Sequence, residues 1–433
     1  MTAMWTAVAV LAATYAAVMS EKLNRSIVAL LGALMMIVLG ILSQEEAIEG
    51  IDFNTIGLLV GMMIIVSITR KSGVFEYLAI WSAKRVKASP AGILAMLAVV
   101  TAVMSAFLDN VTTVLLVVPV TLVITEQLKV DPYPFLFSQI IASNIGGTAT
   151  LIGDPPNILI GTQVGLSFND FVVNLAPVIV VVLIVHVLSM HALWGRKMTA
   201  APEAMAKVMA FDERRAITDH RLLKQALAVL AIVIAAFVSS RHIGLEAGAI
   251  GMAGAAFLML LDNVGRSSEH QTENITKVFG EVEWITIFFF VGLFMVIAGV
   301  EHTGALKLLA DQLVAATGAD LQVTGLAVMW ASAVLSAIVD NIPFVATMIP
   351  LIKAMAPSFG GPEGLMPLWW ALSLGACLGG NGTLIGASAN LTVAGIAERN
   401  GIPFRFLRYT KIAFPLMILH VAICHIYLLW RYL

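Results

Sequence analysis

The chain has 433 residues, of which 59% are hydrophobic and 12% charged, and its mean hydropathy is +0.93. Soluble domains do not have so apolar a composition, which excludes a water-soluble enzyme and indicates a membrane protein whose main partner is the lipid bilayer. The net charge of −2 gives no basic surface for nucleic acid. Both cysteines, Cys377 and Cys424, fall in apolar segments, so no disulfide framework is indicated.

Apolar stretches of the length that transmembrane helices need recur along the whole chain. The first, 2–19, has neither a basic start nor a small-residue cleavage site, so we interpret it as a span and not as a signal peptide. The others have the approximate bounds 26–43, 53–69, 90–106, 111–127, 134–165, 171–194, 225–240, 245–261, 284–300, 325–339, 342–355, 367–396 and 411–430.

Two pairs of these segments are separated only by short polar breaks. Asp109 and Asn110 interrupt the stretch 90–127, and Asp340 and Asn341 interrupt the stretch 325–355. A carboxylate at lipid depth is costly unless the chain turns there inside protein. Each pair is therefore predicted to form a re-entrant helical hairpin with its tip near the membrane midplane.

Two further segments, 134–165 and 367–396, are predicted to be broken helices. In the first, Pro155 and Pro156 lack amide donors and disfavour helix in the preceding residue. The second contains the glycine-rich approach Gly379-Gly380-Asn381-Gly382.

These features occur twice at a constant spacing. Asp340 follows Asp109 by 231 residues, and Thr303-Gly304 follows Ser72-Gly73 by the same distance. With two residues of drift, the stretch 150–157 corresponds to 383–390. The spacing predicts two repeats, 1–194 and 225–433, joined by a polar linker at 195–224.

Basic residues concentrate in alternate loops, which sets the topology. The loop with Lys22 and Arg25, the 195–224 linker and the loop after 396 are predicted to be cytoplasmic, with both termini outside a cell membrane. The prediction is an all-α polytopic membrane protein of about ten transmembrane helices plus two re-entrant hairpins. The repeats are inverted, and the two broken helices lie at the midplane.

Inverted repeats with polar breaks at matching positions are typical of secondary transporters with a site at the midplane. A functional role is the default for an aspartate inside the membrane, whereas an asparagine or threonine there can equally be a contact between helices. The first repeat is predicted to wall the site with Asp109, Asn110, Thr112, Asn144, Asp154 and Asn157. The second repeat is predicted to contribute Asp340, Asn341, Asn381, Thr383, Ser388 and Asn390.

Three stretches, 108–116, 144–157 and 339–343, resemble the ion-transporter superfamily. This superfamily includes the arsenite-efflux permeases (ArsB), the melanosomal P protein, sodium/proton antiporters and divalent-anion/sodium symporters. The chain is most similar to the ArsB and P-protein branch, and the resemblance implies elevator-type alternating access. In the symporters a Ser-Asn-Thr motif at the hairpin tips helps to hold sodium, whereas here Asp109-Asn110-Val111 and Asp340-Asn341-Ile342 occupy those places.

The expected site contains three carboxylates and no lysine or arginine, so a di- or tricarboxylate would meet like charge. A neutral trivalent hydroxide of arsenic or antimony fits better, because asparagine, threonine and aspartate can hydrogen-bond its hydroxyls. We therefore expect efflux of arsenite or antimonite driven by the proton motive force, without a cofactor or bound metal, with Asp109 and Asp340 as proton carriers.

Several alternatives stay open at this point. A sodium/proton antiporter could use the same aspartates, and a transporter of a small organic or inorganic anion comes next. An aspartyl intramembrane protease is disfavoured, because the Tyr-Asp and Gly-x-Gly-Asp patterns of such enzymes are missing. The sequence leaves open whether the chain forms a homodimer and whether an ATPase subunit associates with it.

Overall fold

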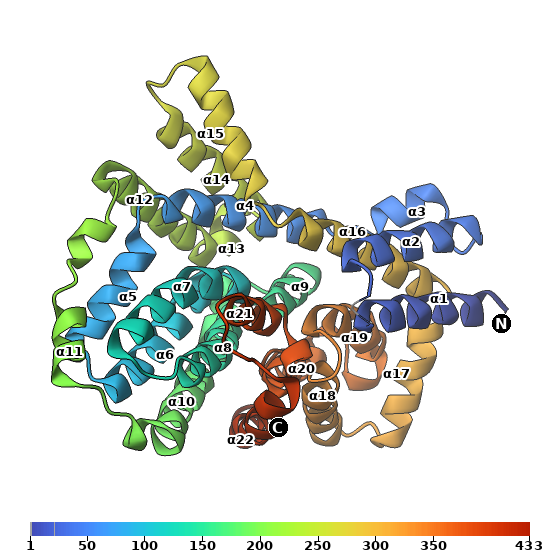
Figure 1. Cartoon of the computed structure of the whole chain (residues 1–433). Coiled ribbons are helices and arrows are strands. Elements are labelled where there is room, and N and C mark those ends of the chain that lie inside the picture. Colours follow the sequence, from blue (N-terminus) through green and yellow to red (C-terminus); the bar gives the residue numbers. More distant parts are fainter. Residues whose placement is uncertain (1, 21) are drawn as a thin grey trace.

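The computed structural model describes every residue except 1 and 21, and the described residues form helices and turns without any strand. Eight helices in this part of the chain are long and apolar enough to cross a membrane. The number is nine if α17 (Ala305–Ala316) and α18 (Leu321–Ser336), which meet at an angle of 120°, count as one span. The predicted class, a multi-pass all-α membrane protein, is confirmed (Figure 1).

The remaining helices follow one another along the chain. The first part contains α1 (Thr2–Met19), α2 (Arg25–Val38), α3 (Gln44–Glu49), α4 (Phe53–Arg70), α5 (Val74–Arg85), α6 (Pro90–Phe107), α7 (Asn110–Leu128), α8 (Tyr133–Thr148), α9 (Pro155–Val164), α10 (Phe168–Leu193) and α11 (Pro202–Met209). The second part contains α12 (His220–Val238), α13 (Ser240–Ile243), α14 (Ala247–Asn263), α15 (Ser268–Gly280), α16 (Trp284–His302), α19 (Asn341–Ala354), α20 (Met366–Gly379), α21 (Ser388–Arg399) and α22 (Phe406–Arg431). Short 3₁₀ turns lie at 195–197, 213–216, 356–359, 362–365, 380–382 and 384–386.

Both predicted hairpin breaks are present. The first tip, residues 108–110, joins α6 to α7, and the second tip, residues 337–341, joins α18 to α19. Asp109 is the N-cap of α7 and accepts a hydrogen bond from Thr112 N at 2.8 Å. Asp340 is the N-cap of α19 and accepts one from Ile342 N at 3.0 Å. Each aspartate therefore satisfies an amide that a starting helix leaves unpaired.

The two broken helices are also confirmed, since α8 stops before α9 and α20 stops before α21. One asparagine bridges each break from the helix that follows it. Asn157 Nδ2 donates to Thr150 O at 2.9 Å, and Asn390 Nδ2 donates to Thr383 O at 2.9 Å. These residues correspond in the repeat register, so the same side-chain bond holds the backbone open in both repeats.

The helices flanking these elements are paired crosswise between the two parts of the chain. Helix α4 packs against α14, and α16 packs against α2. Glycine makes both close approaches possible. A Cβ on Gly61 would lie 2.4 Å from the carbonyl carbon of Gly251, and a Cβ on Gly292 would lie 2.5 Å from that of Ala29. Because each part contributes one helix to each pair, the two parts interlock.

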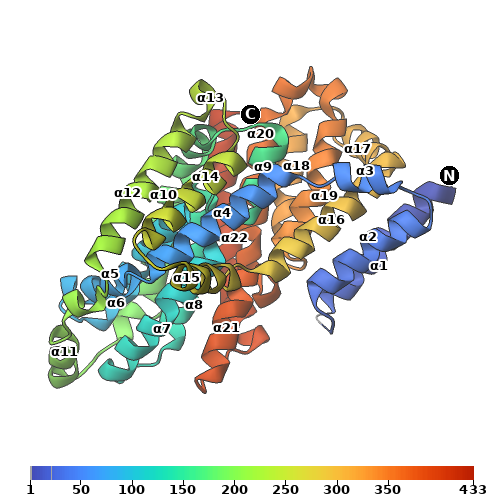
Figure 2. The ribbon, with the colours of Figure 1, turned by 90° about the horizontal axis from the view of Figure 1, so that it is seen from above.

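The helices α5 and α17, which are too short for a transmembrane span, were not predicted from the sequence. Both start after a glycine in the left-handed region, Gly73 (φ 79°) and Gly304 (φ 76°), and the two glycines correspond in the repeat register. Figure 2 shows α1 and α2 at one end of the molecule and α11 and α12 at the other, with α22 between them.

Candidate transport site

Both tips reach one carboxylate, that of Asp154, which precedes α9 and is fully buried. Asn110 Nδ2 of the first tip donates to Asp154 Oδ1 at 3.1 Å, and Asn341 Nδ2, next to the second tip's Asp340, lies 3.5 Å from the same oxygen. The other oxygen, Asp154 Oδ2, has no hydrogen-bond partner among the described residues. Polar breaks that are far apart in the sequence therefore converge at this junction.

Beside Asp154 lies a set of buried asparagine side chains from both repeats, which we call the central amide cluster: Asn110, Asn144, Asn381 and Asn390. Asn144 Oδ1 accepts a hydrogen bond from Asn110 Nδ2 at 2.9 Å. Asn144 Nδ2 donates to Asn381 Oδ1 at 2.9 Å and to Asn390 Oδ1 at 3.0 Å. These hydrogen bonds join the two repeats inside the protein, while Asn110 Oδ1 and Asn381 Nδ2 have no hydrogen-bond partner among the described residues.

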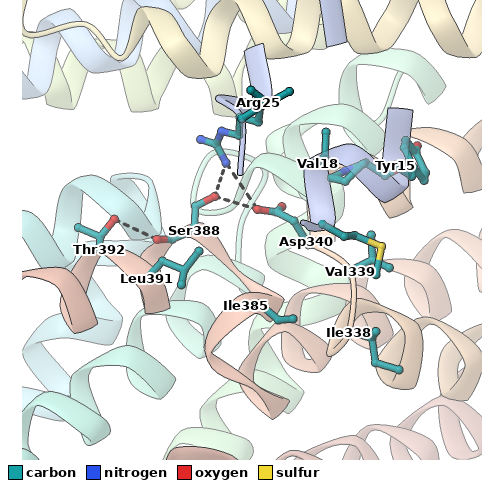
Figure 3. A pocket seen from close by; sticks show the side chains of 13 residues that line it. Tyr15, Val18, Arg25, Ile338, Val339, Asp340, Ile385, Ser388, Leu391 and Thr392 are labelled. Carbon is teal, nitrogen blue, oxygen red and sulfur yellow. Dashed lines mark hydrogen bonds and ion pairs between the residues drawn. The ribbon is translucent and has the colours of Figure 1, made fainter. Parts of the chain in front are cut away.

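A basic side chain reaches the site, and the expectation that no lysine or arginine does so is wrong. Arg25 is the first residue of α2, whose N-cap Asn24 accepts a hydrogen bond from Ser26 N at 3.0 Å. Arg25 Nη1 donates to Ser388 Oγ at 2.6 Å and lies 3.5 Å from Asp340 Oδ2 (Figure 3). The sequence placed Arg25 in a loop, but a long side chain at a helix end can reach well beyond its own backbone.

The guanidinium of Arg25 connects to two carboxylates through hydroxyl groups. On one side, Ser388 Oγ donates to Asp340 Oδ2 at 2.9 Å. On the other side, Arg25 Nη2 donates to Thr286 Oγ1 at 2.8 Å, and that hydroxyl donates to Glu283 Oε2 at 3.0 Å. Glu283 and Thr286 were not among the predicted site residues. The available signal for Glu283 was the repeat register, in which it corresponds to Asp52.

Three cavities adjoin Arg25. A small cavity of about 20 Å³ at the junction is lined by Arg25 together with Asp109, Asp154 and Glu283. A second cavity, of about 320 Å³, lies between α1 and the second tip and includes Asp340 in its lining. A third, of about 470 Å³, borders Arg25 beside Glu283. The site therefore contains four carboxyl groups and one guanidinium. A ligand here would be held by amide and hydroxyl hydrogen bonds and by this single positive charge.

Three other predicted site residues bind parts of the protein framework. Thr112 Oγ1 donates to the carboxylate of Asp109, which completes the cap of α7. Asn157 Oδ1 accepts a hydrogen bond from Ser373 Oγ at 2.5 Å, so its side chain links α9 to α20. Thr383 Oγ1 donates at 2.5 Å to a backbone carbonyl of the second tip. These contacts hold the breaks and tips in place around the junction.

Known proteins resemble this chain in sequence and in fold. The profile of the CitMHS family, described as a citrate transporter, matches residues 15–375. An uncharacterized transporter of Mycobacterium bovis is 42% identical over 430 residues, which cover 98% of both chains. The P protein of Homo sapiens is 34% identical over 506 residues, which cover 98% of this chain and 59% of the P protein. In the crystal structure of the Alcanivorax borkumensis YdaH transporter, 86% of the chain aligns with 89% of this one, with a TM-score of 0.61 at 15% identity.

Proposed function

Because the chain belongs to the CitMHS citrate transporter family, within the superfamily that its sequence resembles, we propose that it couples proton movement to the transport of a small organic anion. The family and the similarity to P protein make the chain a secondary transporter and not an enzyme, as the sequence predicted. The anion and the proton are our proposal.

The observation that carries the proposal is the position of Arg25 beside Asp340, 3.5 Å apart. The preference for arsenite in the sequence analysis depended on a site without positive charge. A guanidinium supplies the counter-charge and the paired N–H donors that a substrate carboxylate needs. The description of the family as a citrate transporter points to the same class of substrate.

The proton is assigned to Asp154. A buried carboxylate without a basic partner is costly as an anion, so a proton or a cation should accompany it. Asp109 and Asp340 accept backbone hydrogen bonds as helix caps, whereas Asp154 Oδ2 accepts none from the described residues. Because Asp154 contacts both tips, a change in its protonation would act on both repeats.

The test uses the full chain in proteoliposomes that contain a trapped pH indicator, with an imposed citrate gradient. Wild type should move protons with citrate, and Asp154→Asn should reduce this movement roughly tenfold or more, equivalent to about 1.4 kcal/mol in the limiting barrier. Asp311→Asn removes an exposed carboxylate from α17 and is the matched control. If no organic anion drives proton movement in wild type, the proposal is wrong.

Arsenite efflux is the second candidate, and the central amide cluster favours it. Amide groups that donate and accept can satisfy the hydroxyls of a neutral metalloid hydroxide, and four carboxyl groups would not repel it. Proton movement driven by arsenite but not by citrate would support this candidate. Proton movement driven by sodium alone would instead support the sodium/proton antiporter.

A further inference from the structure

The cavity between α1 and the second tip has a charged end and mostly apolar walls. It holds about 320 Å³ between the end of α1, the start of α2, the second tip and α21 (Figure 3). Its wall includes the apolar side chains of Val18, Leu23 and Ile338. Arg25 and Asp340 form its polar end, and their side chains are 25% and 17% exposed, respectively. A ligand that fills this space needs an apolar body and one polar group.

The guanidinium at the polar end has no carboxylate in short, paired contact. A guanidinium binds a carboxylate best through two parallel N–H···O bonds. In this structure its two terminal nitrogens donate to hydroxyls, those of Ser388 at 2.6 Å and Thr286 at 2.8 Å. Asp340 Oδ2 stays 3.5 Å from Arg25 Nη1. The paired geometry is therefore available to a carboxylate that enters from the cavity.

We propose that the substrate is a monocarboxylate with a compact apolar body, whose carboxylate takes the place of Asp340 beside Arg25. This inference rests on the proposed transport of an organic anion and narrows its class. Further carboxylates on the substrate would face either the cavity wall, where the hydroxyls of Tyr15 and Thr392 already donate to backbone carbonyls, or the carboxyl groups of Asp109, Asp154 and Glu283. A tricarboxylate is a poorer ligand for both reasons.

Asp340 is the group that competes with a substrate carboxylate for Arg25. The other charged groups in the lining of the two cavities around it are Glu283 before α16, and Asp109 and Asp154 across the junction. Among these groups only Arg25 is positive. Replacing Asp340 by the uncharged asparagine removes the competing carboxylate, so a substrate carboxylate should still pair with the guanidinium.

The experiment measures binding of benzoate and of citrate to the purified full chain by calorimetry. Wild type should bind benzoate roughly tenfold more tightly than citrate. Asp340→Asn removes the competing carboxylate and keeps a side chain that can cap α19, so it should bind benzoate at least as tightly as wild type. Arg25→Gln should bind it roughly tenfold more weakly than wild type. Lys22→Gln, which removes an exposed neighbouring charge, should behave like wild type.

Val18→Trp adds bulk to a partly buried position in the cavity wall without changing any charge, and it should also lose benzoate binding. Thermal unfolding of each variant without ligand shows whether it has folded. The inference is overturned if wild type does not bind benzoate, if Arg25→Gln binds it as wild type does, or if Asp340→Asn binds it more weakly than wild type does. If benzoate fails while citrate still drives proton movement in proteoliposomes, only the monocarboxylate is wrong. If neither anion acts, the proposed function fails with it.

Discussion

Replacing Asn144 by alanine should separate the contribution of the central amide cluster from that of ordinary packing. The change removes three hydrogen bonds and strands the buried acceptors Asn381 Oδ1 and Asn390 Oδ1. Hydrogen bonds between membrane helices average about 0.6 kcal/mol, which gives a loss of about 2 kcal/mol for three. Two stranded acceptors at about 1–3 kcal/mol each give up to about 6 kcal/mol. We therefore expect the free energy of unfolding to fall by at least about 2 kcal/mol.

The adjacent residue offers a matched control. Ser143 is equally buried, but its hydroxyl donates to Ile140 O of its own helix at 2.8 Å, so Ser143→Ala strands no group of the other repeat. Reversible unfolding of both variants in mixed micelles, followed by circular dichroism, measures the difference. The control should lose less than about 1 kcal/mol. Equal losses in the two variants would refute the idea that the amide cluster holds the repeats together.

Two further predictions concern the helix packing and the polar linker at 195–224. Gly61→Ala places a Cβ 2.4 Å from the backbone of α14 and should lower the free energy of unfolding by about 1–3 kcal/mol. Gly57→Ala is the control, because its Cβ would lie 3.5 Å from the same helix and should change the free energy of unfolding little. Equal effects of the two variants would contradict the close packing of α4 against α14. A hydrogen bond from Lys84 at 2.5 Å lowers the pKa of Glu213 below its ordinary value of 4.5. The pair therefore stabilises the folded chain fully above pH 4.5, and this stabilisation is lost only as the pH falls through the lowered pKa of Glu213 in the folded state. Amide hydrogen exchange of residues 202–217 should therefore be faster at neutral pH in Glu213→Gln than in wild type. Wild type should stay protected from exchange down to at least about pH 4.5. Identical exchange of the two proteins at neutral pH would contradict a stabilising role for the Lys84–Glu213 pair.

The elements that could be predicted from the sequence are those whose cause is local. Pro155 and Pro156 lack amide donors, so α8 cannot continue as one helix into α9. At each tip, an aspartate caps the helix that follows. The repeat spacing added information that no single segment carries. It pairs Asn157 with Asn390, and the structure gives these two side chains equivalent bonds across their breaks.

The part of the site that could not be predicted depends on the reach of one side chain. Arg25 stands beside an apolar segment and next to loop residues, and the distribution of basic residues made it a marker of topology. Its partner Asp340 lies 315 residues away in the sequence, and both α2 and α19 pack against α16. The wrong prediction that no basic side chain reaches the site had placed arsenite ahead of an organic anion. With Arg25 present, an anionic ligand can bind beside the same carboxylates, and the order of the candidate substrates is reversed.

The two repeats have the same arrangement of tips and broken helices, but they contribute different side chains to the candidate site. In the repeat register Asp154 corresponds to Ala387, and Ser388 corresponds to Pro155. The first break therefore supplies a buried carboxylate, and the second supplies the hydroxyl that lies between Arg25 and Asp340. In the proposed mechanism the proton acts from the first repeat and the anion from the second. Because Asp154 contacts residues at both tips, either event changes the contacts of the same junction, and this shared junction is where coupling between proton and substrate can arise.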